Sequence, residues 1–144
     1  PPAVVRATSS ESSAGQTAPP TSAEGWVWPA GGNLITRFNG AAGENGIDIA
    51  GVDGSPIRAA ANGKVVYVGT GLRGYGLLLI IKHDETFLSA YAHNRAVTVN
   101  EGDEISSGQV IAEMGQSGAS SVRLHFEIRR NGQPIDPLTI LPGR

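Results

Sequence analysis

The sequence lacks cysteine, and its 144 residues include only one methionine and eight aromatic side chains: two tryptophans, three tyrosines and three phenylalanines. Without cysteine the chain forms neither a disulfide nor a thiolate metal site, and this absence fits a cytosolic or an extracytoplasmic protein equally well. No apolar run approaches the roughly 20 residues that span a membrane. The formal net charge of −2 argues against a nucleic-acid-binding protein, which usually presents a basic face.

Glycine and proline are abundant instead, with 20 and 9 copies, and no helical heptad pattern accompanies them. This composition predicts many short strands joined by tight turns, in a chain long enough to bury one core. Because Pro1-Pro2 is not a natural start, we expect the chain to be part of a longer protein with an upstream signal or anchor.

The first 24 residues differ in composition from the rest of the chain. They are rich in Ser, Thr, Ala and Pro, and such a stretch buries too little apolar surface to fold alone. We therefore predict a linker over residues 1–24 and one folded domain over residues 25–144. Trp26 and Trp28 are expected to anchor the edge of that domain by packing.

Hydrophobic patterning predicts three strands in the second half of the chain. Residues 87–93 alternate between apolar and polar side chains, whereas residues 77–83 form a continuous apolar run that is typical of a strand buried on both faces. Residues 123–129 alternate as well. One face of this last strand is expected to carry Leu124, Phe126 and Ile128, and the other Arg123, His125, Glu127 and Arg129.

A weak internal repeat relates residues 54–66 to residues 102–111. Each segment contains a turn, a short strand, a second glycine turn and a second strand, and two such units commonly pair in a compact β-sandwich. Lipoyl and biotinyl carrier domains show the same pattern. They present a modified lysine at a hairpin tip, however, whereas Lys82 lies in an apolar strand.

Asp48 and His125 carry the clearest chemistry. Asp48 follows a glycine-rich loop that can present its carboxylate, and His125 lies on the polar face of its predicted strand. Carboxylate oxygen and imidazole nitrogen are ordinary zinc ligands, but a catalytic zinc needs three protein ligands and an open position for water. Taken alone, the two residues are equally explained by a turn aspartate and a packed core histidine.

From about Trp28 to Pro142 the chain resembles the LytM-type (M23, lysostaphin-like) metallopeptidase domain. This resemblance implies an all-β fold, a β-sandwich of short antiparallel strands with a central groove. The matching segments follow one another in the family's order and spacing: Gly46-Ile47-Asp48-Ile49-Ala50, Gly54 to Ala60, Gly74-Tyr75-Gly76, Tyr91-Ala92-His93, Gly102 to Ala112, Gly115 to Gly118, and Leu124-His125-Phe126-Glu127-Ile128.

In active members of this family zinc is held by the His and Asp of H-x-x-x-D and by the second His of H-x-H. The resemblance places the zinc aspartate on Asp48, the last zinc ligand on His125 and the Tyr-Ala-His base on His93. Glu44 stands where the first zinc histidine is expected, and Arg123 replaces the first His of H-x-H. Glutamate can ligate zinc, but arginine stays protonated and cannot act as a general base.

These two replacements suggest what takes the place of the metal. Glu44 and Asp48 are expected to lie close together, so that without a cation between them one carboxylate pKa rises. We hypothesise that Arg123 supplies the missing positive charge through hydrogen bonds to these carboxylates. The alternative is that Arg123 points into solvent. We predict no catalytic residues, no bound metal and no cofactor.

The pattern is most similar to degenerate LytM domains that activate bacterial division amidases. That resemblance implies a periplasmic domain that acts in septal peptidoglycan splitting by relieving the autoinhibition of a zinc-dependent N-acetylmuramoyl-L-alanine amidase. It also implies an upstream lipid anchor in the outer membrane and an upstream peptidoglycan-binding LysM module. The expected partner-binding groove consists of Glu44, Asp48, Arg73, Tyr75, His93, Arg123 and His125.

Two other functions remain open from the sequence. One is a weak zinc metallopeptidase that uses Glu44, Asp48 and His125 and cleaves peptidoglycan cross-links. The other is a peptidoglycan-binding module without an amidase partner. Outside the groove, we expect His83 to be structural, and Glu127 is a candidate for pairing with a nearby cation.

Overall fold

The computed structural model describes residues 25–143, so the linker predicted over residues 1–24 lies outside the described residues. The described chain forms strands and two short 3-10 helices, and none of its helices is long and apolar enough to cross a membrane. The elements are β1 (Leu34–Thr36), η1 (Gly40–Ala42), β2 (Ile47–Ala50), β3 (Pro56–Arg58), β4 (Gly63–Gly69), β5 (Leu77–Lys82), β6 (Phe87–Val97), β7 (Glu104–Ile105), β8 (Val110–Met114), β9 (Arg123–Arg130), β10 (Gln133–Ile135) and η2 (Pro137–Thr139).

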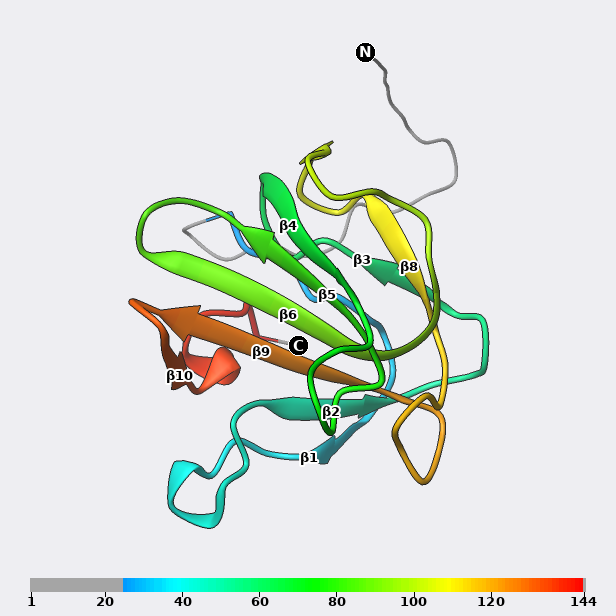
Figure 1. The fold of residues 1–144 in the computed structure, drawn as a ribbon. Helices are drawn as coiled ribbons and strands as arrows, with labels where there is room; N and C mark the ends of the chain where they lie inside the picture. The colour runs from blue at the N-terminus through cyan, green and yellow to red at the C-terminus, as the bar shows by residue number, and fades with distance from the viewer. Residues whose placement is uncertain (1–24, 144) are drawn as a thin grey trace.

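All strand pairs are antiparallel, which confirms the predicted all-β class. The main layer has the order β1-β2-β9-β6-β5-β4-β7, and β10 pairs with β9 (Figure 1). The long strand β6 links this layer to β3 and β8, because its first half pairs with β5 and β9 and its second half pairs with β8. The two layers are therefore continuous through one strand.

The predicted internal repeat corresponds to reciprocal pairing between its two units. Strand β3 of the first unit pairs with β8 of the second, and β4 of the first unit pairs with β7 of the second. Lys82 ends β5, one residue before the turn that leads to β6. Through these two pairings, the two units hold β3 and β8 against the main layer.

The core lies between these layers and is built from the inward-facing positions of each strand. In β9 the buried apolar side chains are Leu124, Phe126 and Ile128, as the alternation predicts. The two tryptophans near the start of the domain are also buried in this core, which confirms their role as packing anchors. Trp28 also donates a hydrogen bond from Nε1 to the carbonyl oxygen of Pro142 at 2.6 Å and so ties the two ends of the domain together.

Strand β5 is apolar on both faces, as predicted from its continuous run. Leu79 and Ile81 belong to the main core, whereas Leu78 and Ile80 belong to a second, smaller cluster with Ala90 and two tyrosines. Antiparallel sheets usually expose a polar face to water. The outward face of β5 instead carries a second buried apolar cluster, in which Leu78 is 2% exposed.

His83 is structural, as expected from the sequence. It belongs to a chain of hydrogen bonds in which every group donates in the same direction along the chain. The Ala60 N–H donates to the Tyr91 hydroxyl at 2.9 Å, and that hydroxyl lies 2.6 Å from Ser89 Oγ. Ser89 Oγ lies 2.7 Å from His83 Nε2, and His83 Nδ1 lies 2.6 Å from the carbonyl oxygen of Asn62. Since a carbonyl only accepts, Nδ1 carries the proton and a neutral ring satisfies every group. Burial lowers the pKa of His83, which favours that neutral form.

Two backbone positions with positive φ bring the loop after β4 against the second half of β6. His93 has φ 68° within β6, and Gly76 has φ 61° just before β5. A Cβ atom on Gly76 would overlap the carbonyl oxygen of Ser117, whereas one on Gly74, at φ 91°, would meet open space. Gly76 is thus required both by backbone conformation and by close packing, and it fixes the position of Tyr75 between the two glycines.

The two glycines provide a matched pair for a stability measurement. Gly74→Ala should lower the free energy of unfolding by about 1 kcal/mol, because only the backbone conformation is unfavourable for a side chain. Gly76→Ala should lower it by roughly 3 kcal/mol, because the added methyl group also displaces the Ser117 loop. Urea denaturation of both variants measures the difference, and equal losses would show that the contact with Ser117 is not tight.

Candidate functional site

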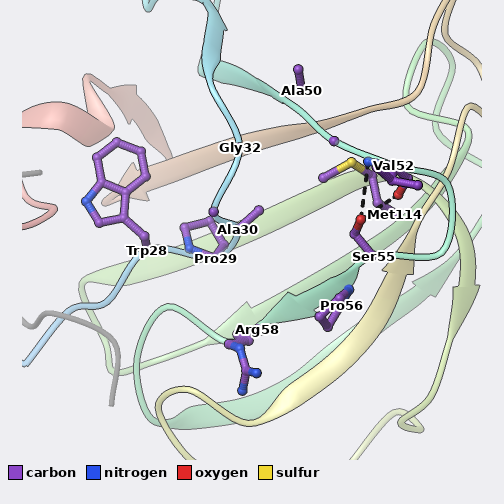
Figure 2. Close-up of a pocket in the computed structure, with 12 residues that line it drawn as sticks. Trp28, Pro29, Ala30, Gly32, Ala50, Val52, Ser55, Pro56, Arg58 and Met114 are labelled. Carbon is purple, nitrogen blue, oxygen red and sulfur yellow. Dashed lines mark hydrogen bonds between the residues drawn. The ribbon is translucent and has the colours of Figure 1, made fainter. Parts of the chain in front are cut away.

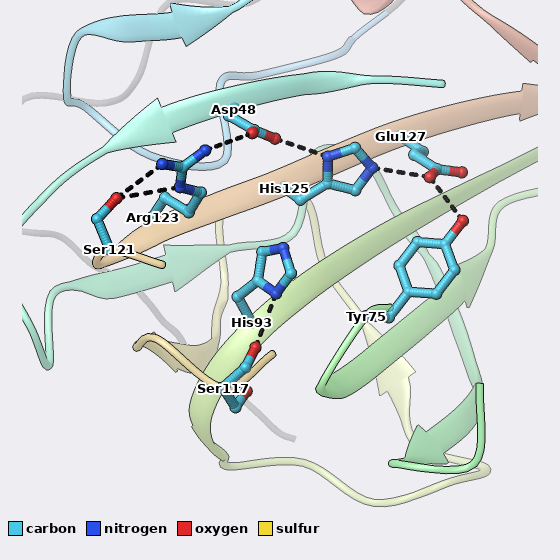
Figure 3. A network of polar contacts seen from close by, with 8 residues as sticks. All are labelled: Asp48, Tyr75, His93, Ser117, Ser121, Arg123, His125 and Glu127. Atoms are coloured by element: carbon cyan, nitrogen blue, oxygen red, sulfur yellow. Dashed lines mark hydrogen bonds and ion pairs between the residues drawn. The ribbon is translucent and has the colours of Figure 1, made fainter. Parts of the chain in front are cut away.

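The polar face of β9 and the neighbouring strand β2 form the centre of the candidate site. Alternation along β9 places Arg123, His125, Glu127 and Arg129 on the face opposite the core. Strand β2 runs antiparallel beside it, and the register sets Asp48 directly opposite His125. Figure 3 shows the resulting row of side chains, with Tyr75 approaching from the loop before β5.

Asp48 is held by two cationic side chains. Arg123 donates from Nη1 to Asp48 Oδ2 at 3.0 Å, and His125 Nδ1 lies 2.6 Å from Asp48 Oδ1. Arg123 also donates from Nη2 to Ser121 Oγ at 2.7 Å, which orients the guanidinium. The side chain of Arg123 is 23% exposed, so it lies along the site instead of extending into solvent.

Glu127 is the second anionic centre, and it makes more contacts than the sequence indicated. His125 Nε2 lies 2.8 Å from Glu127 Oε2, and the Tyr75 hydroxyl donates to the same oxygen at 2.9 Å. Arg129 donates to Glu127 Oε1 from Nε at 2.9 Å and from Nη2 at 2.7 Å. With a side chain only 1% exposed, Glu127 is a buried carboxylate whose oxygens are satisfied by three partners.

His125 is positively charged in this arrangement. Both of its ring nitrogens face carboxylate oxygens that can only accept, so both carry protons. Burial acts to lower the pKa of His125, but the hydrogen bonds with Asp48 and Glu127 raise it to about 9. For each carboxylate, burial acts to raise the pKa, and the bonds from His125 and its arginine outweigh burial, so both pKa values are lowered.

The expected interaction between Glu44 and Asp48 is not present. Glu44 is exposed in the turn before β2, and no hydrogen bond or ion pair of its side chain is found among residues 25–143. Its backbone instead pairs with Asn39. The pKa of Asp48 is lowered and not raised, so the predicted repulsion between two carboxylates is wrong at Asp48. Of the two carboxylates that we expected Arg123 to contact, it contacts only Asp48.

His93 lies beside this row but remains neutral. Its Nδ1 is 2.7 Å from the carbonyl oxygen of Ser117, which only accepts, so the proton lies on Nδ1. The ring centroids of His93 and His125 are 6.1 Å apart. Burial lowers the pKa of His93, and the neighbouring charge of His125 lowers it further, although the bond to Ser117 acts in the opposite direction. His93 therefore presents an unprotonated Nε2 beside a charged network.

The donor set does not fit a catalytic zinc ion. Asp48 and His125, on which the resemblance places two zinc ligands, are bonded to each other, and both ring nitrogens of His125 face carboxylate oxygens. Arg123 adds a fixed positive charge beside them. Across residues 25–143, no three His, Cys, Asp or Glu side chains are grouped so as to hold a metal.

Five of the seven residues that the sequence assigned to the groove line one open hollow of about 230 Å³: Glu44, Arg73, Tyr75, His93 and His125. The other two, Asp48 and Arg123, are linked to that hollow through His125. Sequence reasoning missed Ser117 and Ser121, whose serine character gave no signal, and it gave Glu127 only a minor role. The sequence signal for Glu127 was its place on the polar face of β9.

A second hollow, of about 420 Å³, lies away from this network and is lined by segments around Trp28 and Met114 (Figure 2). The polar side chains at its wall are already engaged. Ser55 Oγ accepts from the Val52 N–H at 3.2 Å and donates to the Val52 carbonyl at 2.6 Å, and Arg58 donates to the Gly108 carbonyl at 3.0 Å. Charged side chains therefore converge on the hollow beside His125 and not on this second hollow.

The raised pKa of His125 predicts how stability depends on pH. A group whose pKa is higher in the folded state stabilises the fold fully below its unfolded pKa of about 6.5. This contribution, on the order of 3 kcal/mol, is lost as pH rises through about 9. Chemical denaturation between pH 6.5 and 9.5 should therefore show falling stability in the wild type and a much flatter profile in His125→Gln. A wild-type profile without slope in this range would contradict the charged state of His125.

The sequence matches a known family over most of the described domain. Residues 42–137 match Peptidase family M23. The chain is 60% identical over 122 residues to a Pseudomonas aeruginosa protein named lipoprotein NlpD/LppB homolog, which covers 83% of this chain and 41% of the relative. It is 54% identical over 120 residues to the murein hydrolase activator NlpD of Escherichia coli, covering 83% of this chain and 32% of the relative. The chain thus spans well under half the length of these relatives.

A solved structure supports the same relationship. The catalytic domain of the antimicrobial peptidase lysostaphin from Staphylococcus simulans has a TM-score of 0.64 with this structure and is 26% identical in sequence, with 76% of this chain and 88% of that chain covered. The match of sequence and the match of fold agree, and together they show that the chain belongs to Peptidase family M23.

Proposed function

We propose that this chain is a non-catalytic member of its family that activates peptidoglycan hydrolysis by a partner enzyme. The partner is a periplasmic, zinc-dependent N-acetylmuramoyl-L-alanine amidase, and the activation serves septal peptidoglycan splitting during cell division. The chain binds this amidase with the groove that holds zinc in active family members, and the amidase performs the hydrolysis.

The internal pairing of the former metal site is the observation that carries this proposal. Asp48, Arg123 and His125 satisfy one another at distances of 2.6 Å and 3.0 Å. A cationic arginine in this position provides neither a zinc ligand nor a general base. The same pairing keeps the side chains of the groove ordered without a metal, and a preorganised surface loses less conformational entropy when a partner binds.

The names of two relatives support the same conclusion. The relative from Escherichia coli is named an activator of murein hydrolases, and the Pseudomonas relative is named a lipoprotein. Both share more than half of their aligned residues with this chain. These names support a lipoprotein that activates peptidoglycan hydrolysis in the cell envelope. We propose that its activating domain lies in the periplasm, that its anchor lies in the outer membrane and that a LysM module precedes the linker.

The groove offers its partner a mixed surface. Glu44 and Arg73 are exposed at its rim, and Tyr75, His93 and His125 form its floor. Asp48, which is held by Arg123, bonds to His125 and fixes its orientation. We expect the rim residues to govern the encounter with the amidase and the floor residues to govern how tightly the complex holds.

Cell-wall digestion with purified components tests this function. Labelled sacculi are incubated with the chain alone, with the amidase alone and with both, and released label is measured. We expect release by the mixture well above that by the amidase alone, and none by the chain alone. Arg123→Ala should reduce the stimulation at least about tenfold, because it removes the cation that orders Asp48 and the floor of the groove.

Arg130→Ala is the matched control, because Arg130 lies on the same strand, is exposed and makes no side-chain hydrogen bond with residues 25–143. Circular dichroism must show that both variants are folded, and Arg123→Lys adds a variant that keeps the charge but not the planar fork. Release of label by the chain alone, together with bound zinc in metal analysis, would instead identify a weak peptidase. Binding to sacculi without any effect on the amidase would identify a wall-binding module.

A further inference from the structure

The outer face of the sheet beside the groove is apolar. Leu78 and Ile80 point outward from β5, and with Ala90 of β6 they form the cluster that is separate from the main core. No described strand or helix covers this face as a further layer (Figure 1), but Tyr67 and Tyr75 pack on it, and Leu78 and Ala90 are only 2% and 8% exposed. The exposed apolar surface beside this cluster comes from Leu72, which is 46% exposed, and exposed apolar surface next to a hollow is typical of a contact site for another molecule.

This face contains a hollow of about 350 Å³, which we call the apolar trough. Its lining includes Leu72, Leu78, Ile80, Leu88 and Ala90. The trough shares two wall residues, Tyr75 and Glu127, with the polar hollow beside His125. The two hollows are therefore neighbours along one groove, with an apolar end on the sheet and a charged end at the former metal site.

One loop contributes to both ends through consecutive residues. Leu72 lines the trough and is 46% exposed, whereas Arg73 lines the polar hollow. The other arginines near the groove are occupied, because Arg123 is paired with Asp48 and Arg129 with Glu127. Arg73 makes no hydrogen bond or ion pair with its side chain among residues 25–143, so its guanidinium is available to an incoming anion.

We propose that the groove recognises a segment of the partner amidase in which apolar side chains are followed within a few residues by an aspartate or glutamate. The apolar side chains enter the trough against Leu72, and the carboxylate pairs with Arg73. This inference rests on the proposed function, and it names the chemistry of the segment that the activator recognises.

The lining of the trough argues against a peptidoglycan strand as its occupant. Glycan chains present hydroxyl and amide groups at almost every position, and burying such groups without hydrogen-bond partners is unfavourable. Leu72, Leu78, Ile80 and Leu88 provide no side-chain donors or acceptors. A peptide segment with apolar side chains matches this surface, and the charge of Arg73 selects an acidic neighbour.

Calorimetric titration of the 144-residue chain with the purified amidase, at low and at moderate salt, tests the two ends separately. Leu72→Ser should weaken binding by about 5- to 20-fold, because it removes apolar surface from the trough wall. Arg73→Glu should weaken binding at least about tenfold and abolish most of its salt dependence, while Arg73→Lys stays within about threefold of the wild type.

Matched controls come from residues outside both hollows. Val66→Ser changes a similarly exposed apolar side chain on β4, and Arg37→Glu reverses an exposed arginine in the loop after β1. Both should bind the amidase as the wild type does. If Leu72→Ser and Arg73→Glu bind as the controls do while the wild type binds and stimulates the amidase, the inference is overturned and the proposed function stands. If the wild type neither binds nor stimulates, the proposed function itself fails.

The chemistry of the bound segment can be read directly. A photoreactive benzoylphenylalanine placed at position 72 should cross-link to the purified amidase, and mass spectrometry of the product identifies the captured segment. We expect apolar residues adjacent to an acidic residue, whose reversal to lysine restores binding to Arg73→Glu. A cross-link to a segment without a nearby acidic residue, or to peptidoglycan fragments in preference to the amidase, contradicts the inference.

Discussion

The carboxylate of Asp48, held between Arg123 and His125, is the interaction on which the rest of the site depends. The negative charge of this carboxylate is compensated by two cationic partners at hydrogen-bond distance. Removing either partner would leave a largely buried carboxylate undercompensated, which is costly in a low-dielectric environment. Because β2 and β9 are neighbours in register, the pairing also joins the two strands across the polar face of the sheet.

This pairing leaves the architecture of the peptidase fold intact. The core on the opposite face of β9 depends on apolar alternation and not on the polar row, so substitutions in the row need not disturb the sheet. Within the row, Glu127 repeats the same arrangement, with His125 on one side and Arg129 on the other. Two carboxylates and three cations alternate along it, and each charge has an opposite neighbour.

Periodicity in the sequence predicted the strands β5, β6 and β9, the double-sided apolar character of β5 and the two faces of β9. It also placed Arg123 and His125 on one face, whereas Asp48 was assigned to the same site by the resemblance to the metallopeptidase family. The position of Glu44 was not predictable in this way, because a glycine-rich turn precedes β2 and its geometry depends on pairing with Asn39. The central role of Glu127 depends on Tyr75, a loop residue distant in the sequence. Close packing, and not a periodic pattern, fixes the approach of Tyr75.

Nuclear magnetic resonance titration of the His125 ring nitrogens, with and without one equivalent of zinc, reports directly on the pairing of His125 with Asp48 and Glu127. We expect that both nitrogens are protonated at pH 7, that the ring titrates with a pKa of about 9, and that zinc changes neither signal. A neutral ring at pH 7, or a shift to a metal-bound nitrogen on adding zinc, would contradict the assignment of this site as an internally paired binding groove.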